Sequence, residues 1–258
     1  MKLRFLGTGT SHGIPVLGCD CRVCTSPDPR DTRYRCSALV EGELGERVLI
    51  DAGPEFRLQA LRAGICRLDA VLITHAHADH VHGLDDLRPL CRKNPLAVWA
   101  SKEDEQELRE RFSYVFREGQ EGGGKPRLKL CELGPEGVRI GSLQAIPIPL
   151  EHGERRVYGY RIGPLAYLTD CSGIPEASMR LLAGIRVLVL DALRERAHPT
   201  HFSLREAFAV ALELRPERLY LTHICHDLTH GEVLGLCAAA GLPFIAEPAY
   251  DGLSIEFI

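Results

Sequence analysis

The sequence predicts an α/β fold with mixed sheets. Short apolar runs typical of strands alternate with amphipathic helical runs along the 258 residues. Strand-like runs follow one another without an intervening helix between residues 138 and 169, which indicates antiparallel pairing in that part of the chain. A content of 45% hydrophobic and 26% charged residues is typical of globular proteins and excludes fibrous and disordered classes.

Ten runs are predicted to be strands because they are short, apolar and bounded by turn-forming residues. They are Lys2–Leu6, Arg47–Ile50, Ala70–Thr74, Ala97–Ala100, Val138–Pro149, Tyr158–Ile162, Leu165–Thr169, Val187–Leu190, Arg218–Thr222 and Ser254–Phe257.

Six runs between them have the helical period. They are Pro54–Ala63, Leu84–Cys91, Lys102–Phe116, Pro175–Leu182, Ser203–Leu214 and Gly231–Ala240. Several carry start signals, namely the prolines at 54 and 175 and the capping-box spacing of Ser203 and Glu206.

No shift in composition and no internal repeat divides the chain, so we expect one domain over residues 1–258. The loosest stretch is Glu118–Pro126, EGQEGGGKP, where glycines and charges disfavour a packed element. It follows a charged helix, and two interpretations stay open: an ordinary surface loop or a flap over a site.

Charge and cysteine content indicate the compartment and the partners. A net charge of −4 and a pI near 6.3 give no overall positive field, so nucleic acid is not an expected partner. The start MKLRFLGTG is too short for a secretory signal, and charged residues or histidine interrupt every later apolar run, so we expect a cytoplasmic protein without membrane contact. In a reducing compartment, ten clustered cysteines favour metal binding over disulfides.

The segment DAVLITHAHADHVHG, residues 69–83, points to a metal site. Imidazoles at His75 and His77, on a loop that leaves a strand, can converge on one ion, and Asp79 and His80 are placed to reach a second. Four potential ligands within six residues are hard to explain by packing. His82 falls outside this pattern, and we expect it to be exposed or to support the ligands.

The motif His75-x-His77-x-Asp79-His80 resembles the signature of the metallo-β-lactamase superfamily. The resemblance implies a four-layer αββα sandwich with mixed sheets. It also implies further ligands at strand ends, which match His152 in PLEHG, Asp170 in YLTDCSG and His223 in YLTHICH. A buried aspartate that orients the histidine loop matches Asp51 in VLIDAG.

This set implies two divalent ions, zinc or manganese, in the active site. His75, His77 and His152 would hold one ion, Asp79, His80 and His223 the other, and Asp170 would bridge them, because one carboxylate has an oxygen for each. Two ions roughly 3.5–4 Å apart share a hydroxide at neutral pH, which suits phosphodiester hydrolysis.

Three cysteines near the N-terminus predict a structural zinc. Cys19, Cys21 and Cys24 lie within six residues, in a loop of about residues 18–36, and thiolates so close together suit a soft tetrahedral ion. The competing interpretation is a group of free thiols. The favoured fourth ligand is His226, and the alternatives are Cys225 and Cys36.

The combination of LGTGTSxGxP, GCxCxxC, HxHxDH, LTDxSG and LTHxxH resembles the PhnP-type phosphodiesterases of the carbon–phosphorus lyase pathway, which are close to the tRNA 3′-processing nucleases. The resemblance covers the whole chain. It implies hydrolysis of a small cyclic or activated phosphodiester, such as a ribose 1,2-cyclic phosphate. His201, with His198 as the alternative, would assist the leaving group, so that Asp79 and His201 are the expected catalytic residues.

Three other functions remain as alternatives. They are an RNA 3′-end nuclease, a thioester or lactam hydrolase of the same superfamily, and a catalytically silent metal-binding module. The acidic charge balance disfavours the first, His201 disfavours the second, and the complete ligand set disfavours the third. The expected partner is a small-molecule phosphodiester, and a homodimer stays open.

Overall fold

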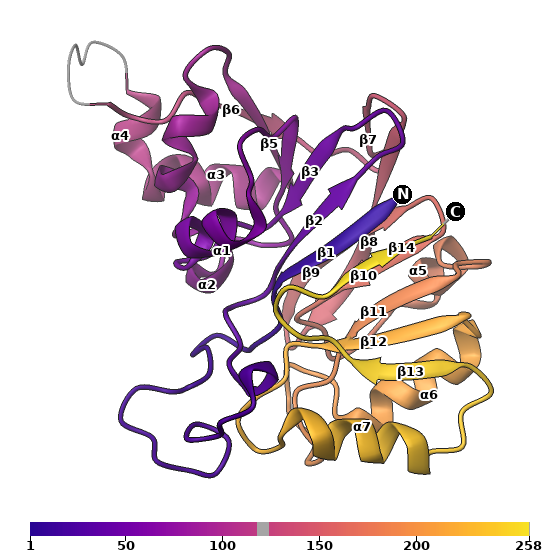
Figure 1. The fold of residues 1–258 in the computed structure, drawn as a ribbon. Coiled ribbons are helices and arrows are strands. Elements are labelled where there is room, and N and C mark those ends of the chain that lie inside the picture. The colour runs from indigo at the N-terminus through magenta and orange to yellow at the C-terminus, as the bar shows by residue number, and fades with distance from the viewer. Residues whose placement is uncertain (118–123, 258) are drawn as a thin grey trace.

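Two seven-stranded sheets pack face to face, and helices cover the outer face of each (Figure 1). The computed structural model describes residues 1–117 and 124–257. The predicted four-layer αββα sandwich is confirmed. Residues 118–123, the main part of the predicted loop or flap, lie outside the described residues.

The first sheet has the order β14-β1-β2-β3-β4-β5-β6, and its strands from β3 to β6 are parallel. Its strands are β1 (Lys2–Gly7), β2 (Ser37–Glu41), β3 (Arg47–Ile50), β4 (Ala70–Leu72), β5 (Leu96–Ala100), β6 (Leu128–Glu132) and β14 (Ser254–Glu256). The helical segments on this side are α1 (Phe56–Ala63), α2 (Ala78–Val81), η2 (Leu84–Cys91), α3 (Lys102–Arg111) and α4 (Ser113–Phe116). The short η1 (Pro29–Asp31) belongs to the loop between β1 and β2 and contacts the start of the helix at residues 230–239.

The second sheet has the order β13-β12-β11-β10-β9-β8-β7. Its strands are β7 (Val138–Ile140), β8 (Leu143–His152), β9 (Arg155–Ile162), β10 (Leu165–Leu168), β11 (Val187–Asp191), β12 (Arg218–Thr222) and β13 (Ile245–Pro248). Strands β7 to β10 pair antiparallel, as the uninterrupted run of strands predicted. Strands β10 to β13 are parallel, and α5 (Glu176–Leu181), α6 (Leu204–Leu214) and α7 (His230–Ala239) lie along this side.

Large apolar side chains fill the space between the sheets. Phe5 of β1 and Tyr220 of β12 place their ring centroids 5.7 Å apart across this layer, and the Tyr160 hydroxyl donates to the Ile73 carbonyl at 2.5 Å. All five residues of β11 are buried, as expected for a parallel strand covered on both faces. The sandwich therefore fixes the positions of its strand ends.

Several sequence expectations need correction. The predicted strand Val138–Pro149 is two strands, because the chain turns at Gly141, whose φ of 58° is in the left-handed region that glycine tolerates. The predicted helix Lys102–Phe116 is broken at Phe112, where φ is −106° and ψ is 34°. Strands β2, β6 and β13 were not predicted, and the Leu84–Cys91 segment is a 3-10 helix.

None of the helices within residues 1–117 and 124–257 combines the length and the apolar character that a membrane crossing requires.

Candidate metal centre

The histidines and aspartates of the predicted site meet at one end of the sandwich. Asp51 follows β3, His75 follows β4 by two residues, His152 ends β8, and His223 follows β12. Parallel strands place their carboxyl ends at the same edge of a sheet, so short loops suffice to gather these side chains. Asp51 and His223, together with Asp170 after β10, have φ of 60°, 57° and 54°. Non-glycine residues hold this conformation at a cost, and such strain clusters at functional sites.

One group of ligands consists of His75, His77 and His152, whose ligand atoms lie within 4.8 Å of one another. The His75 Nε2 and His77 Nδ1 atoms are 2.9 Å apart. The Nδ1 atom of His152 donates to the Thr200 carbonyl at 2.7 Å, which leaves its Nε2 with a lone pair for a metal.

The second group consists of Asp79, His80, Asp170 and His223, again within 4.8 Å. The two oxygens of Asp170 face two rings: Oδ2 lies 3.2 Å from His80 Nε2, and Oδ1 lies 3.1 Å from His223 Nε2. Both imidazole atoms are buried, and neither makes a hydrogen bond of good geometry. Buried polar atoms without a partner normally require an ion or a water, and a carboxylate between two such rings suits a bridging ligand.

Asp51 positions the loop of residues 74–80, which carries His75, His77, Asp79 and His80. Its Oδ2 accepts hydrogen bonds from His80 Nδ1 and from the Thr74 hydroxyl, both at 2.7 Å, and its Oδ1 accepts from the Thr74 amide at 2.8 Å. The His80 proton is therefore held on Nδ1, and Nε2 faces the ligand group. From the other side, Asp104 of α3 accepts from the Ala76 amide at 3.0 Å. No spacing in the sequence signalled Asp104.

His201 borders the centre and is paired with Asp191. The Nδ1 atom of His201 lies 2.7 Å from Asp191 Oδ2, and its ring stacks on His223 with centroids 4.5 Å apart. Ligand atoms of His152, Asp170 and His201 lie within 4.8 Å of one another. Sequence reasoning missed Asp191, although it ends an apolar strand, the same signal that pointed to Asp51 and Asp170.

The two remaining histidines of the motifs lie outside the ligand groups. His198 Nδ1 accepts from the Thr200 amide at 3.3 Å, inside its own loop, so the geometry favours His201 over His198. His82 is exposed and places its ring edge-on to Phe112, with centroids 6.0 Å apart.

The buried carboxylates of the metal centre favour a positive charge beside them, as the pKa values of the neighbouring histidines show. Burial lowers the pKa of His75 well below its ordinary value. Burial also acts to lower the pKa of His80, yet the neighbouring Asp170, Asp51 and Asp79 raise it well above the ordinary value. In the same way, Asp170 raises the pKa of the buried His223 to about 9. These acidic side chains therefore favour cations beside them, and divalent ions fit that demand.

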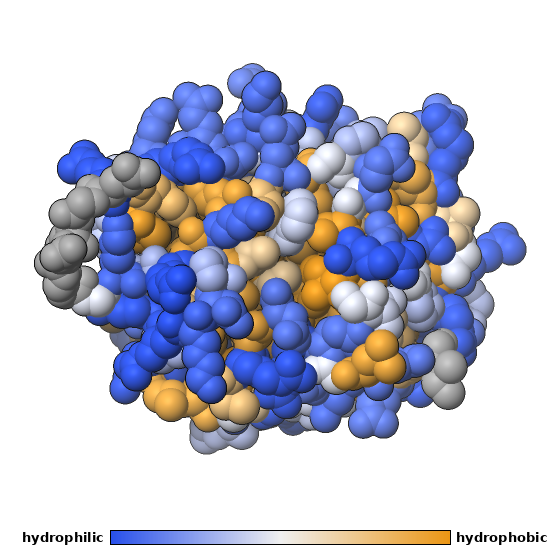
Figure 2. Space-filling view, turned by 90° about the horizontal axis from the view of Figure 1, so that it is seen from above, coloured by the Kyte–Doolittle hydropathy of each residue, from blue (hydrophilic) through white to orange (hydrophobic). Residues whose placement is uncertain are grey.

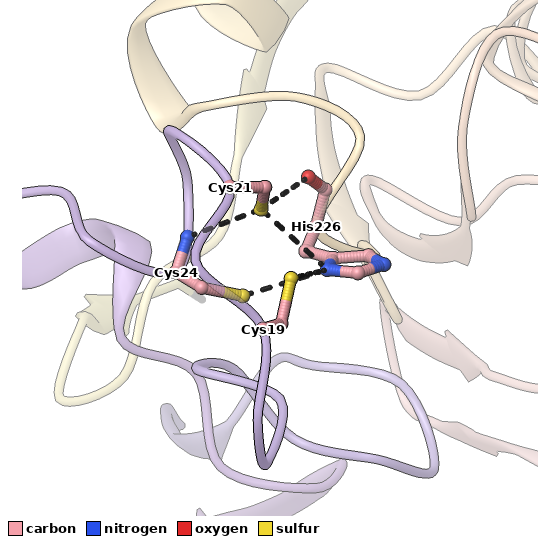
Figure 3. Close-up of side chains that lie close together, drawn as sticks. All are labelled: Cys19, Cys21, Cys24 and His226. Carbon is pink, nitrogen blue, oxygen red and sulfur yellow. Dashed lines mark hydrogen bonds between the residues drawn. The ribbon is translucent and has the colours of Figure 1, made fainter.

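The cysteine loop meets the segment after β12 (Figure 3). The Sγ atoms of Cys19, Cys21 and Cys24 lie 3.4, 3.7 and 3.4 Å from His226 Nδ1. A tetrahedral zinc with bonds of about 2.3 Å to sulfur and about 2.0–2.1 Å to nitrogen separates these atoms by about 3.5 Å, so the set fits this ion. The two alternative fourth ligands, Cys36 and Cys225, are buried outside the group.

A buried ion pair ties the cysteine loop to that segment. Arg33 is fully buried and donates to the carbonyls of Cys225 and Leu228 at 2.9 and 3.1 Å and to Asp31 at 3.2 Å. Asp31 in turn accepts from the His230 amide at 2.6 Å. These bonds hold the chain on both sides of His226, and sequence reasoning did not foresee them.

The two-sheet sandwich and the cluster of histidines and aspartates at its end together indicate the protein family. Residues 46–224 match the family model described as a beta-lactamase superfamily domain, and the chain belongs to the metallo-β-lactamase superfamily. Within it, the chain is 43% identical to a diphosphatase from the PhnP family, with a TM-score of 0.90 over 99% of this chain and 96% of that one. The predicted resemblance to the PhnP type is thereby confirmed.

Two further proteins extend the comparison. An octanoyltransferase of Porphyromonas gingivalis strain W83 is 41% identical over 98% of this chain, but the chain spans about half of that curated relative, 51% of its length. The short form of human tRNase Z is 19% identical with a TM-score of 0.70 over 99% of both chains, which shows a shared fold.

Proposed function

We propose that this protein is a binuclear metal-dependent phosphodiesterase that hydrolyses a small cyclic or activated phosphodiester. The observation that carries the proposal is Asp170, whose two carboxylate oxygens each face an imidazole nitrogen that is buried and without a hydrogen bond. This arrangement suits a carboxylate shared by two cations. Its combination with the His201–Asp191 pair favours chemistry that needs both charge neutralisation and a proton donor.

The ligand assignment follows the two groups. His75, His77 and His152 would hold one divalent ion, zinc or manganese, Asp79, His80 and His223 would hold the other, and Asp170 would serve both. When bound, the two ions supply a hydroxide at neutral pH and neutralise charge on the phosphoryl oxygens. The protein keeps the ligands in place through Asp51 and through the Thr200 carbonyl on His152.

His201 acts on the leaving group. Its Nδ1 is engaged by Asp191, so Nε2 is the nitrogen available to donate a proton to the departing oxygen. The side chain is 11% exposed, which admits a substrate while it limits competition from bulk water. Stacking on His223 fixes the ring beside the ligand groups.

A small substrate suits this chain better than RNA does. A net charge of −4 disfavours a long polyanion, since nucleic-acid binding normally needs several Lys or Arg on one surface. The PhnP-family relative is described as a diphosphatase. A diphosphate linkage is a phosphoanhydride, and its hydrolysis uses the same attack on phosphorus with a better leaving group, so diphosphate esters join ribose cyclic phosphates as the first substrates to test.

We assign octanoyl transfer to the other half of the Porphyromonas relative rather than to the half that this chain matches. Acyl transfer through a thiol needs an accessible thiolate. Cys171, next to Asp170 in the sequence, and Cys36, whose Sγ lies 3.5 Å from the Thr222 hydroxyl, are buried: burial raises the pKa of Cys36 to about 12 and the pKa of Cys171 well above its ordinary value. Neither supplies a thiolate at neutral pH.

The remaining assignments are part of the same proposal. Cys19, Cys21, Cys24 and His226 hold one structural zinc, and residues 1–258 act as a single domain in the cytoplasm, without nucleic-acid or membrane partners.

The test is a substrate panel on metal-loaded protein. It contains bis-p-nitrophenyl phosphate, ribose 1,2-cyclic phosphate, a dinucleoside diphosphate, a structured RNA and an acyl thioester, each with manganese or zinc. We expect turnover of the small phosphoesters and less than a hundredth of that rate on RNA and thioester. Preferred cleavage of either the RNA or the thioester would overturn the proposal.

A further inference from the structure

A hollow of about 560 Å³ lies where β1 begins and β14 ends. Its lining residues are Met1, Lys2, Glu41, Gly42, Gly45, Glu256 and Phe257. We call this surface, together with the turn of residues 42–45, the terminal edge. It lies at the far end of the sandwich from the metal centre, because β3 runs from this turn to Asp51.

The two ends of the described chain are bonded to each other at the terminal edge. The Met1 amino group donates to the Phe257 carbonyl at 2.9 Å, and the Phe257 amide donates to the Met1 carbonyl at 3.0 Å. Figure 1 shows the labels N and C side by side. A segment that is joined to either end therefore leaves the sandwich at the same place.

The terminal edge has an apolar centre and a rim that carries charges of both signs, with Lys2 between Glu41 and Glu256. Leu44, at the turn between β2 and β3, is 81% exposed, and Met1 and Phe257 are half-buried beside the hollow. Figure 2 looks onto this end of the molecule and shows apolar surface divided by charged side chains. The rim carries Glu43 and Glu256, both exposed. An exposed apolar centre within a charged rim is the anatomy of a protein interface.

The Porphyromonas relative identifies the kind of partner. It is named an octanoyltransferase, and this chain aligns over 98% of its own length with about half of that polypeptide. The rest of the relative lies outside the aligned stretch, so it is joined before the position that corresponds to Met1, after the one that corresponds to Phe257, or on both sides. Both positions are at the terminal edge, and a short connection keeps two linked parts at millimolar effective concentration.

We propose that the terminal edge is the docking surface for an acyltransferase of the octanoyltransferase type. Leu44 and Phe257 contact an apolar patch of the partner, and the charged rim around them lies at the edge of the interface. In addition, β14 is the last strand of its sheet, so it leaves an outer edge for the partner to cover.

The first test measures binding between separate chains. This protein is mixed with the octanoyltransferase of the same organism, and the complex is followed by calorimetry and light scattering. We expect a one-to-one complex that Leu44→Glu weakens by about tenfold or more. The matched control is Leu61→Glu on α1, a leucine that is 65% exposed and away from the terminal edge; it should keep the affinity within about twofold.

Three results would overturn the proposal. They are the absence of a complex at roughly 100 μM of each chain, equal affinity for the Leu44→Glu variant and its parent, and a self-dimer that Leu44→Glu dissociates. A second experiment inserts a protease site between the halves of the Porphyromonas polypeptide, and the halves should stay together on gel filtration after cleavage; their separation would also count against docking. The phosphodiesterase rates of the Leu44→Glu and Leu61→Glu variants should equal that of the parent. The binding measurement does not depend on this activity, so the docking proposal is tested separately from the proposed function.

Discussion

Replacing His201 with alanine tests the chemistry most directly. The change removes the ring that stacks on His223 and the partner of Asp191, but it leaves both ligand groups intact. We expect turnover to fall most on substrates with poor leaving groups, such as ribose 1,2-cyclic phosphate. A p-nitrophenolate group departs without a proton, so bis-p-nitrophenyl phosphate should be affected much less.

The expected magnitude follows from the contacts of His201. General acid catalysis contributes about 10²–10⁴-fold, so the barrier for a poor leaving group should rise by about 3–5 kcal/mol. Removal of the ring also leaves Asp191 buried, with one oxygen still accepting from the Cys171 amide at 2.9 Å. The loss of one such bond costs about 1–3 kcal/mol of unfolding free energy, which a protein of this size tolerates.

The assay compares kcat and KM for both substrates with the parent and three variants, His201→Ala, Asp191→Asn and His198→Ala. Metal content and urea unfolding are measured on the same preparations. Asp191→Asn should give a smaller loss with the same substrate preference, because it disturbs only the position of the ring, and His198→Ala should stay within about threefold of the parent. Equal losses on the two substrates for His201→Ala would refute the role of His201 as an acid.

Three further predictions follow from individual residues. Asp79→Ala should abolish phosphodiesterase activity and lower the content of one active-site metal. The protein should stay folded, since Asp79 lies in the metal centre and not in the hydrophobic core. Activity and metal content are measured together, and activity within tenfold of the parent would contradict the binuclear assignment. Because a hydroxyl is a weak zinc ligand, Cys21→Ser should release one zinc per chain and lower the melting temperature. Its effect on KM should be larger than its effect on kcat. An unchanged zinc content and melting temperature would show that the three cysteines are free thiols. Burial raises the pKa of Asp251 to about 7 in the folded protein. Between about pH 4 and pH 7 the folded protein therefore keeps a proton on Asp251 that the unfolded chain has lost. The unfolding free energy of the parent should fall as pH rises through that window. Asp251→Asn should therefore gain unfolding free energy over the parent between pH 5 and pH 7.5 in urea titrations, and a constant difference would show that this carboxyl does not titrate there.

Local patterns in the sequence were sufficient for the fold class and for most of the candidate ligands. His75, His77, Asp79 and His80 lie within six residues, so the sequence alone places these four side chains close together. Asp170 and His223 were found through the resemblance to the metallo-β-lactamase superfamily, and in the structure each lies just after a strand at the same edge of its sheet. The period of apolar residues likewise predicted most of the helices and strands.

Only the tertiary structure decided which distant groups pair. The His201–Asp191 contact, the Asp104 bond to Ala76 and the buried Arg33 all join segments that the sequence gives no reason to connect. Strands β2, β6 and β13 were missed for a related reason, because strand formation depends on the neighbours that pair with it more than on intrinsic preference. The sequence favoured His226 as the fourth ligand of the cysteine group, and its short distances to the three Sγ atoms support it over Cys36 and Cys225. The sequence states which side chains could bind a metal or donate a proton, because that depends on each residue alone. Which of them lie close together across the two sheets depends on how the whole core packs.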